Sequence, residues 1–152
     1  MSLFITFQHI VPQHLLSRSV GYLAASENTF VKNTFIKNFA AKYQINMAEA
    51  LEENPLAYKS FNDFFTRALK PNARPIASDS KAIISPADGA ISQIGAITAD
   101  KIFQAKGHDY SVTTLLGGNE QRAAAFVGGQ FATVYLSPKD YHRVHMPFMG
   151  KL

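Results

Sequence analysis

Two histidines that lie three residues apart are the strongest chemical feature of this sequence. His142 and His145 fall within residues 136–147, between two prolines, in a chain that has five histidines. Imidazole is the side chain that gives and takes protons near neutral pH, and a carboxylate that orients it makes it a better base. Asp88, in the turn-like stretch 85–89, is the candidate carboxylate. This pattern indicates acid–base chemistry.

The same residues allow two other interpretations. His142, His145 and a carboxylate could bind a metal ion, although the spacing marks no third ligand. A structural role is also open, because an Asp before Gly in a turn commonly accepts hydrogen bonds from nearby backbone N–H groups. The pair His108 and Asp109 is a weaker candidate, and we interpret it as part of an exposed loop. From the residues alone, acid–base, metal-binding and structural roles all stay open.

Helices are predicted for the first half of the chain. Pro12 suits the first turn of one helix, where its missing N–H costs nothing. A second helix is predicted over about residues 29–43, where apolar side chains fall broadly on one side. Asn46 and Glu49 have the spacing of a capping box, which predicts a short third helix.

A further helix is predicted after residue 60. Ser60 and Asp63 repeat the capping-box spacing. The aromatic side chains beside them are expected to face the core as a stripe, and these are Phe61, Phe64 and Phe65.

Short strands are predicted from about Pro71 onward. The candidate stretches are separated by turn residues, and they are residues 82–84, 90–94, 102–103 and 131–136. Ser111 is placed to cap a one-turn helix that ends at Gly117 and Gly118. Together these elements predict an α+β fold, in which N-terminal helices are followed by a β-rich core that resembles a barrel or a sandwich.

Charge and apolar spacing near the start of the chain suit an anionic partner. Residues 1–44 hold four basic side chains and one acidic side chain, and the whole chain has a net charge of +4. Such a surface suits a lipid membrane or a nucleic acid, but a solvated helix face is an equal alternative. The residues Phe4, Phe7, Val11 and Leu15 have helical spacing, which predicts an amphipathic helix that lies on lipid or packs on the domain.

Two kinds of feature are missing from the sequence. The apolar stretch 3–25 is interrupted by polar residues, whereas a membrane-spanning helix needs about 20 mostly apolar residues. The chain has no cysteine, which excludes disulfides, thiolate metal sites and a cysteine nucleophile within it.

Several stretches, taken in chain order, resemble the phosphatidylserine decarboxylase family of the bacterial, membrane-associated kind. The most specific is the run from Tyr141 to His145 within residues 136–147. The other matching stretches are residues 61–67, 74–76, 86–89, 104–107, 110–111 and 115–117. The resemblance covers the chain from about residue 60 onward.

The resemblance implies a pyruvoyl-dependent enzyme that converts phosphatidylserine to phosphatidylethanolamine. In this family a late serine, in a Leu-Gly-Ser-Thr-like motif, cleaves its own chain and leaves a pyruvoyl group that forms a Schiff base with the substrate. Asp88 and His145 match the carboxylate and base of the self-cleavage triad, and His142 matches the histidine that serves decarboxylation. No Leu-Gly-Ser-Thr segment occurs in these 152 residues. We therefore expect an incomplete core and an inactive fragment.

The resemblance also implies a division of the chain and its partners. Residues 1–58 would form a helical, membrane-associating region, and residues 59–152 the first part of a β-rich catalytic domain. The expected partners are phosphatidylserine, an anionic membrane surface and the C-terminal alpha chain of the same proenzyme. Homo-oligomer formation is a further expectation, and neither a metal ion nor a nucleic acid is expected. The location implied is the cytoplasmic face of the inner membrane, as a peripheral protein.

Two other classes of function remain as alternatives. The chain could be a non-enzymatic module that binds lipid or a partner through its N-terminal helices. It could also be a serine or metal hydrolase built on Asp88, His142 and His145. The hydrolase requires a nucleophile or a third ligand, and no recognised motif in the sequence provides one.

Overall fold

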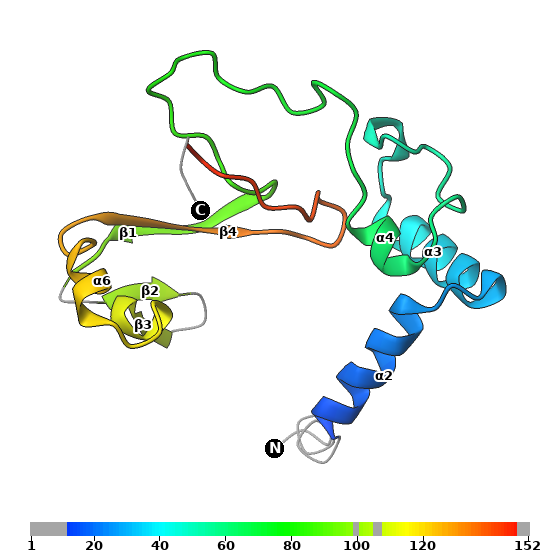
Figure 1. Ribbon diagram of the computed structural model, residues 1–152, viewed down its shortest axis with the longest axis horizontal. Helices are drawn as coiled ribbons and strands as arrows, with labels where there is room; N and C mark the ends of the chain where they lie inside the picture. The colour runs from blue at the N-terminus through cyan, green and yellow to red at the C-terminus, as the bar shows by residue number, and fades with distance from the viewer. Residues whose placement is uncertain (1–11, 99–100, 105–107, 149–152) are drawn as a thin grey trace. The chain divides into compact units, whose positions relative to one another are not determined.

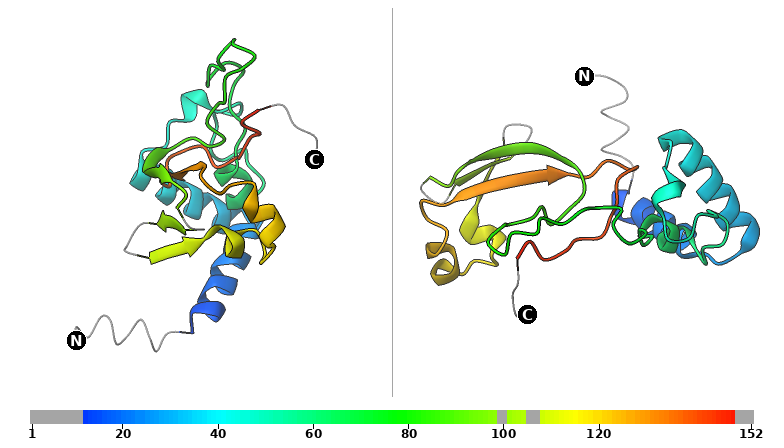
Figure 2. Two further views of the ribbon diagram at one scale, coloured as in Figure 1. Left: turned by 90° about the vertical axis from the view of Figure 1, so that its left-hand side faces the viewer. Right: turned by 90° about the horizontal axis from the view of Figure 1, so that it is seen from above.

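The computed structural model describes residues 12–98, 101–104 and 108–148, with the side chains of 102–104 and 108–109 left aside. The chain separates into two compact units, Met1–Ile84 and Ser85–Leu152. Figures 1 and 2 show helices in the first unit and paired strands in the second. The boundary predicted between residues 58 and 59 separates a membrane-associating region from a catalytic one. The division into compact units does not test such a functional boundary, so it stays a prediction.

The first unit is built from helices that begin at polar caps. Its elements are α2 (Gln13–Ala25), α3 (Thr29–Tyr43), the 3₁₀ turn η1 (Met47–Glu49) and α4 (Phe61–Phe65). Asn28 starts α3 by accepting the N–H groups of Phe30 and Val31 at 3.1 and 3.2 Å. Gln44, in the left-handed conformation at φ 53°, ends it. The helix predicted over residues 29–43 is confirmed.

Aromatic side chains form the core of the first unit. Phe64 from α4 and Ile36 from α3 are fully buried, and the ring of Phe61 stacks on that of Phe35 with centroids 4.4 Å apart. Phe39 meets Phe61 edge to face at 4.9 Å, an arrangement that aromatic rings prefer. The prediction that this aromatic stripe faces the core is confirmed. Ser60 caps α4 by accepting the Asp63 N–H, as its spacing predicted.

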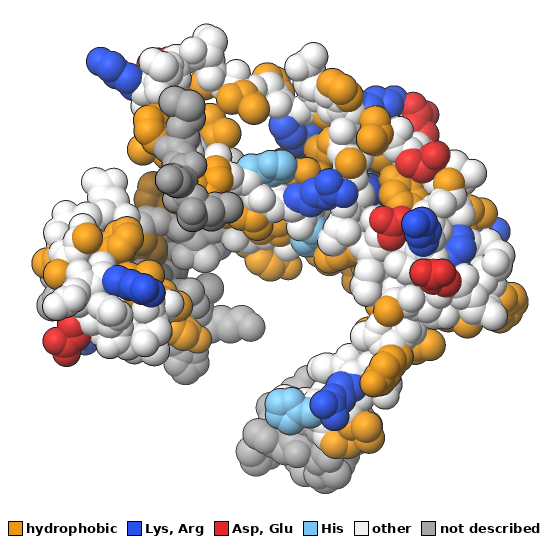
Figure 3. All heavy atoms as spheres, viewed as in Figure 1, with side chains coloured by type: hydrophobic (Ala, Val, Ile, Leu, Met, Phe, Trp, Pro, Cys, Tyr) orange, Lys and Arg blue, Asp and Glu red, His pale blue; other side chains and the backbone are white. Residues whose placement is uncertain are grey.

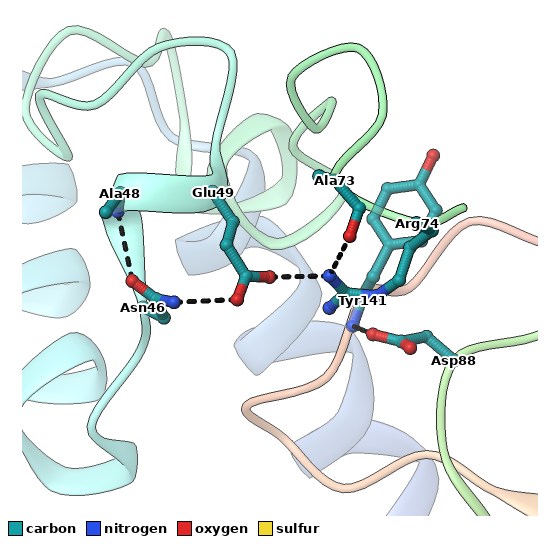
Figure 4. Close-up of polar contacts among 7 residues, drawn as sticks. All are labelled: Asn46, Ala48, Glu49, Ala73, Arg74, Asp88 and Tyr141. Atoms are coloured by element: carbon teal, nitrogen blue, oxygen red, sulfur yellow. Dashed lines mark hydrogen bonds and ion pairs between the residues drawn. The ribbon is translucent and has the colours of Figure 1, made fainter.

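Basic side chains of the first unit also have structural partners. The guanidinium of Arg67 is buried and lies over the Phe64 ring, 5.7 Å from its centroid. Arg74 pairs with Glu49 at 2.7 Å and also donates to the Ala73 carbonyl, as Figure 4 shows. Arg67 and Arg74 therefore help to stabilise the first unit through these contacts.

Helix α2 differs from α3 because most of its apolar side chains are exposed. Ala24 is its buried residue, whereas Leu15, Leu16, Tyr22 and Leu23 are exposed. Figure 3 shows hydrophobic side chains on the surface of this helix. The predicted positions Phe4, Phe7 and Val11 lie outside the described residues. No helix in the described ranges is long and apolar enough to cross a membrane.

The second unit contains two antiparallel strand pairs. Strand β1 (Ala90–Ala96) pairs with β4 (Gln130–Tyr135), with a bulge between Ile91 and Gln93. Strand β2 (Lys101–Gln104) pairs with β3 (His108–Ser111). The short helices α5 (Val112–Leu115) and α6 (Glu120–Ala124) lie between β3 and β4 in the chain. Ile97, Val112 and Ala123 form a small core with Leu116 and Phe131 packed on it.

The α+β fold class is confirmed, and the described residues form no closed barrel. The predicted strands at 90–94, 102–103 and 131–136 appear as β1, β2 and β4. Ser111 caps α5 through the Thr114 N–H, and Gly117 and Gly118 follow at positive φ, as predicted.

Three predictions about local structure are wrong or incomplete. Residues 82–84 form no strand, because they have no neighbouring strand to pair with in the described chain. The stretch around His108 and Asp109 is strand β3 rather than a loop, since it pairs with β2. Helix α6 was not predicted; Asn119 caps it by accepting the Arg122 N–H at 3.0 Å.

Candidate active site

The turn that carries Asp88 enters β1 at a point of close backbone contact. The Ser85 hydroxyl donates to the Ala87 carbonyl at 2.8 Å, which tightens the turn. At Gly89 a Cβ atom would lie 2.3 Å from the Tyr135 carbonyl oxygen, so only glycine fits without a shift of the backbone. Because Tyr135 is the last residue of β4, Asp88 is placed beside the loop that follows this strand.

The loop after β4 starts with a hydrogen-bonded turn. The Asp140 N–H donates to the Ser137 carbonyl at 2.9 Å. In return, the Asp140 carboxylate accepts the Ser137 N–H at 2.6 Å. Pro138 occupies the second position of this turn, where its fixed φ is favourable. The turn sets the direction in which the chain continues toward the two candidate histidines.

Two hydrogen bonds join this loop to the turn that carries Asp88. The Asp88 carboxylate accepts the Tyr141 N–H at 3.3 Å, which Figure 4 shows. The Pro86 carbonyl accepts the His145 N–H at 2.8 Å. Segments that lie more than fifty residues apart in the sequence are thus side by side. The structure brings the three predicted site residues onto two adjoining segments.

His142 is half-buried, and its ring is held by the backbone. Its Nε2 lies 3.1 Å from the Ser137 carbonyl oxygen. A carbonyl oxygen only accepts hydrogen bonds, so Nε2 carries the proton in this contact. In the neutral ring, Nδ1 is then the nitrogen with the lone pair.

His145 is exposed and contacts Tyr141. The Tyr141 hydroxyl lies 2.9 Å from Nε2 of His145, and the two rings stack with centroids 5.5 Å apart and an angle of 18°. The backbone N–H of Tyr141 is also the donor to Asp88. Tyr141 therefore connects Asp88 to His145 through its backbone and its side chain. A direct bond from Asp88 to His145 stays a prediction.

Sequence reasoning did not single out Tyr141, Ser137 or Asp140 as members of this site. Tyr141 and His145 are four residues apart, but they lie outside any helix, so their spacing alone predicted no contact. Ser137 contributes its backbone carbonyl group, and a pattern of side chains in the sequence cannot predict such a contact. Within the described ranges, no group of three His, Cys, Asp or Glu side chains is placed to hold a metal ion.

In this α+β protein, a turn carboxylate and two imidazoles lie on adjoining segments beside the β1–β4 pair. The chain belongs to the phosphatidylserine decarboxylase family, whose model, described as "Phosphatidylserine decarboxylase", matches residues 61–152. A second family model, described as "PSD", matches residues 3–44. The predicted family is therefore confirmed.

Similar curated proteins carry the name phosphatidylserine decarboxylase proenzyme. The protein from Bordetella avium is 58% identical over 150 residues, which are 99% of this chain and 51% of that protein. The protein from Hahella chejuensis is 59% identical over 150 residues, with the same two shares of 99% and 51%. The protein from Alcanivorax borkumensis is 59% identical over 151 residues, covering 99% of this chain and 52% of its own length. The chain thus spans about half the length of the curated relatives it matches.

Proposed function

We propose that this chain supplies the acid–base residues of an enzyme that decarboxylates phosphatidylserine to phosphatidylethanolamine. Membership of the family supports the reaction. The observation that carries the proposal is the pair of hydrogen bonds, Tyr141 N–H to Asp88 and His145 N–H to Pro86, because they bring the Asp88 turn against the histidine loop. Isolated structural histidines would not require this connection.

The proposed roles follow from the surroundings of each side chain. His145 is exposed, so its imidazole can be reached by a serine hydroxyl of another segment and can take its proton during self-cleavage. Asp88 is half-buried next to this loop, and we assign to it the role of the carboxylate that orients the base. His142 is half-buried and contacts the Ser137 carbonyl instead. We assign to it the delivery of the proton that replaces the departing carboxyl group.

The side chains present suit a pyruvoyl group as cofactor. When bound, that group would draw electrons from the bond between the substrate's α-carbon and its carboxyl group. Imidazole N–H and tyrosine hydroxyl groups are donors that a carbonyl oxygen accepts, and His145 and Tyr141 carry such groups on one loop. The serine precursor would come from outside these residues, since the 152 residues contain no Leu-Gly-Ser-Thr segment. We therefore propose that the 152 residues alone are inactive.

Attachment to a membrane is the second part of the proposal. Helix α2 exposes Leu15, Leu16, Tyr22 and Leu23, and an exposed apolar helix with nearby basic residues can lie in a lipid headgroup layer. This arrangement would bring a membrane-bound substrate to the enzyme at the cytoplasmic face of the inner membrane. The exposed apolar side chains of α2 also favour the alternative, a lipid-binding module without catalytic activity.

The experiment that tests the proposal separates chain cleavage from decarboxylation. The protein used is this chain joined to the second half of the Hahella chejuensis relative, which we name the completed protein. We expect His145→Ala and Asp88→Ala to remain uncleaved. We expect His142→Ala to cleave but to release little CO₂ from phosphatidylserine.

A gel that resolves the two chains and a CO₂ assay give the two readouts. His108→Ala is the matched control, because His108 lies in β3 and has no assigned role. If His142→Ala stays uncleaved while His145→Ala cleaves normally, the two roles are reversed. If all three variants cleave and release CO₂ as the wild type does, the proposed site is wrong.

A further inference from the structure

We infer that Asp140 is a positioning residue for His142 in the decarboxylation step, and that it acts by fixing the Ser137 carbonyl that accepts from Nε2 of this imidazole. The inference rests on the proposed function for the identity of the substrate. Its structural part, the connection from Asp140 through Ser137 to His142, stands on the contacts alone.

Asp140 makes two hydrogen bonds to Ser137 across the turn, one through its side chain and one through its backbone. Its carboxylate accepts the Ser137 N–H at 2.6 Å, and its own N–H donates to the Ser137 carbonyl at 2.9 Å. Hydrogen bonds to an ionised carboxylate are stronger than those between neutral groups. The peptide groups on both sides of Ser137 are therefore fixed by one side chain and one backbone N–H from the same residue.

The fixed carbonyl of Ser137 is a group that holds the His142 ring. Its oxygen has two lone pairs, and the two donors it receives are the Asp140 N–H and Nε2 of His142, at 2.9 and 3.1 Å. Because this oxygen cannot donate, the contact selects the tautomer with the proton on Nε2. Loss of the Asp140 carboxylate would loosen the turn and weaken the hydrogen bond between its carbonyl and Nε2 of His142.

The Ser137 hydroxyl takes no part in this arrangement. Its oxygen is buried and has no hydrogen-bond partner among the described residues. Ser137 therefore acts through its backbone, and removing its hydroxyl should leave the orientation of His142 unchanged. Ser137→Ala is for this reason a matched control for Asp140→Ala.

The first test is NMR of the 152-residue chain with ¹⁵N-labelled histidine, which requires no enzymatic activity. His14, exposed on α2, is the internal reference. We expect the Nε2 proton of His142 to exchange with solvent roughly tenfold more slowly than that of His14, as one hydrogen bond would cause. The difference should persist in Ser137→Ala and Asp140→Asn, since Asn keeps an acceptor oxygen, and should vanish in Asp140→Ala.

The second test uses the completed protein and asks which step is affected. Asp140→Ala should cleave normally but lose decarboxylation, by up to about a hundredfold, because small displacements of a catalytic group have effects of this size. Asp140→Asn should restore part of the rate. In a His142→Ala background, Asp140→Ala should cause no further loss, because both changes act on the same group.

The outcomes that overturn the inference are distinct from a failure of the proposed function. Slow exchange of the His142 proton in Asp140→Ala, or a proton on Nδ1 in the wild type, would refute the connection. Equal loss of cleavage and decarboxylation in Asp140→Ala would mean that Asp140 merely holds the loop. A completed protein that releases no CO₂ at all would refute the proposed function, while the NMR result on Asp140 would still stand.

Discussion

At the scale of single residues, Tyr141 is the member of the candidate site that connects Asp88 with His145. Its N–H donates to Asp88, its hydroxyl lies 2.9 Å from Nε2 of His145, and its ring stacks on that imidazole. In a serine–histidine–aspartate triad, the nitrogen that faces the serine must be available to its hydroxyl. In the structure, Nε2 of His145 is hydrogen-bonded to the Tyr141 hydroxyl. This hydrogen bond must break before that nitrogen can take the serine proton.

This contact leads to a prediction for Tyr141→Phe. The substitution keeps the stacked ring and the backbone N–H, and it removes the competing hydroxyl. We therefore expect the completed protein carrying Tyr141→Phe to cleave at least as fast as the wild type. Tyr141→Ala is the comparison, because it also removes the ring that orients His145, and we expect it to cleave more slowly. The rate of chain separation on a gel is the measurement, and loss of cleavage in Tyr141→Phe would contradict this view.

The sequence alone singled out the ionisable side chains of the candidate site but not the backbone groups that contact them. His142 and His145 stood out because the chain has five histidines and their run is specific, and Asp88 stood out in the turn-like stretch 85–89. The Ser137 carbonyl and the Pro86 carbonyl are backbone groups, which every residue has. Their roles depend on how the loop folds back, and no pattern of side chains predicts that.

At the scale of elements, the contact between β1 and β4 decides where the site lies. Gly89 allows the turn to pass beside the end of β4, where a Cβ would be 2.3 Å from the Tyr135 carbonyl oxygen. Elements with strong local signals, such as α3 with its Asn28 cap, were predicted well. Strand β3 was missed because the sequence His108-Asp109-Tyr110-Ser111 lacks apolar alternation, and its pairing with β2 compensates for this.

The close contact at Gly89 predicts that Gly89→Ala destabilises the strand pair more than Gly95→Ala does. Gly89→Ala should destabilise the β1–β4 pair by about 1–3 kcal/mol, the usual cost of an overpacked site. Gly95→Ala should cost less, because its Cβ would meet the Phe131 ring at 3.2 Å, and a side chain can move.

Amide hydrogen exchange of β1 and β4 measures this difference, since exchange reports local opening. Gly21→Ala is a second control, because a Cβ there meets nothing within 4 Å. We expect it to leave exchange in β1 and β4 unchanged. Equal protection in Gly89→Ala and the wild type would show that the backbone contact is not required.

At the scale of the whole molecule, the first unit contains both a packed core and an exposed helix. Ile36 of α3 is fully buried in that core, so deleting residues 1–44 would remove part of it together with any membrane contact. A change confined to the exposed side of α2 is the cleaner test of membrane attachment. Leu15 and Leu51 are both 63% exposed, and Leu51 lies outside the helices of this unit.

We predict that Leu15→Ser weakens binding to vesicles that contain anionic lipid, whereas Leu51→Ser does not. A leucine that enters the lipid layer contributes up to about tenfold in partitioning, and Leu51 would make no such contact. Added salt should release the protein only in part, because it screens the charges but not the apolar contact. Sedimentation with vesicles is the measurement, and equal binding by Leu15→Ser and the wild type would mean that α2 does not enter the lipid.

The most direct test of the whole account is CO₂ release from phosphatidylserine labelled in its serine carboxyl group. We compare the 152-residue chain with the completed protein, and both are analysed by intact mass. We predict that the chain alone releases no labelled CO₂, and that it keeps one unmodified mass after incubation with the lipid and cyanoborohydride. The completed protein should appear as two chains, release labelled CO₂ and form a reduced adduct with the substrate amine. Labelled CO₂ released by the 152-residue chain, or none released by a cleaved completed protein, would contradict the account.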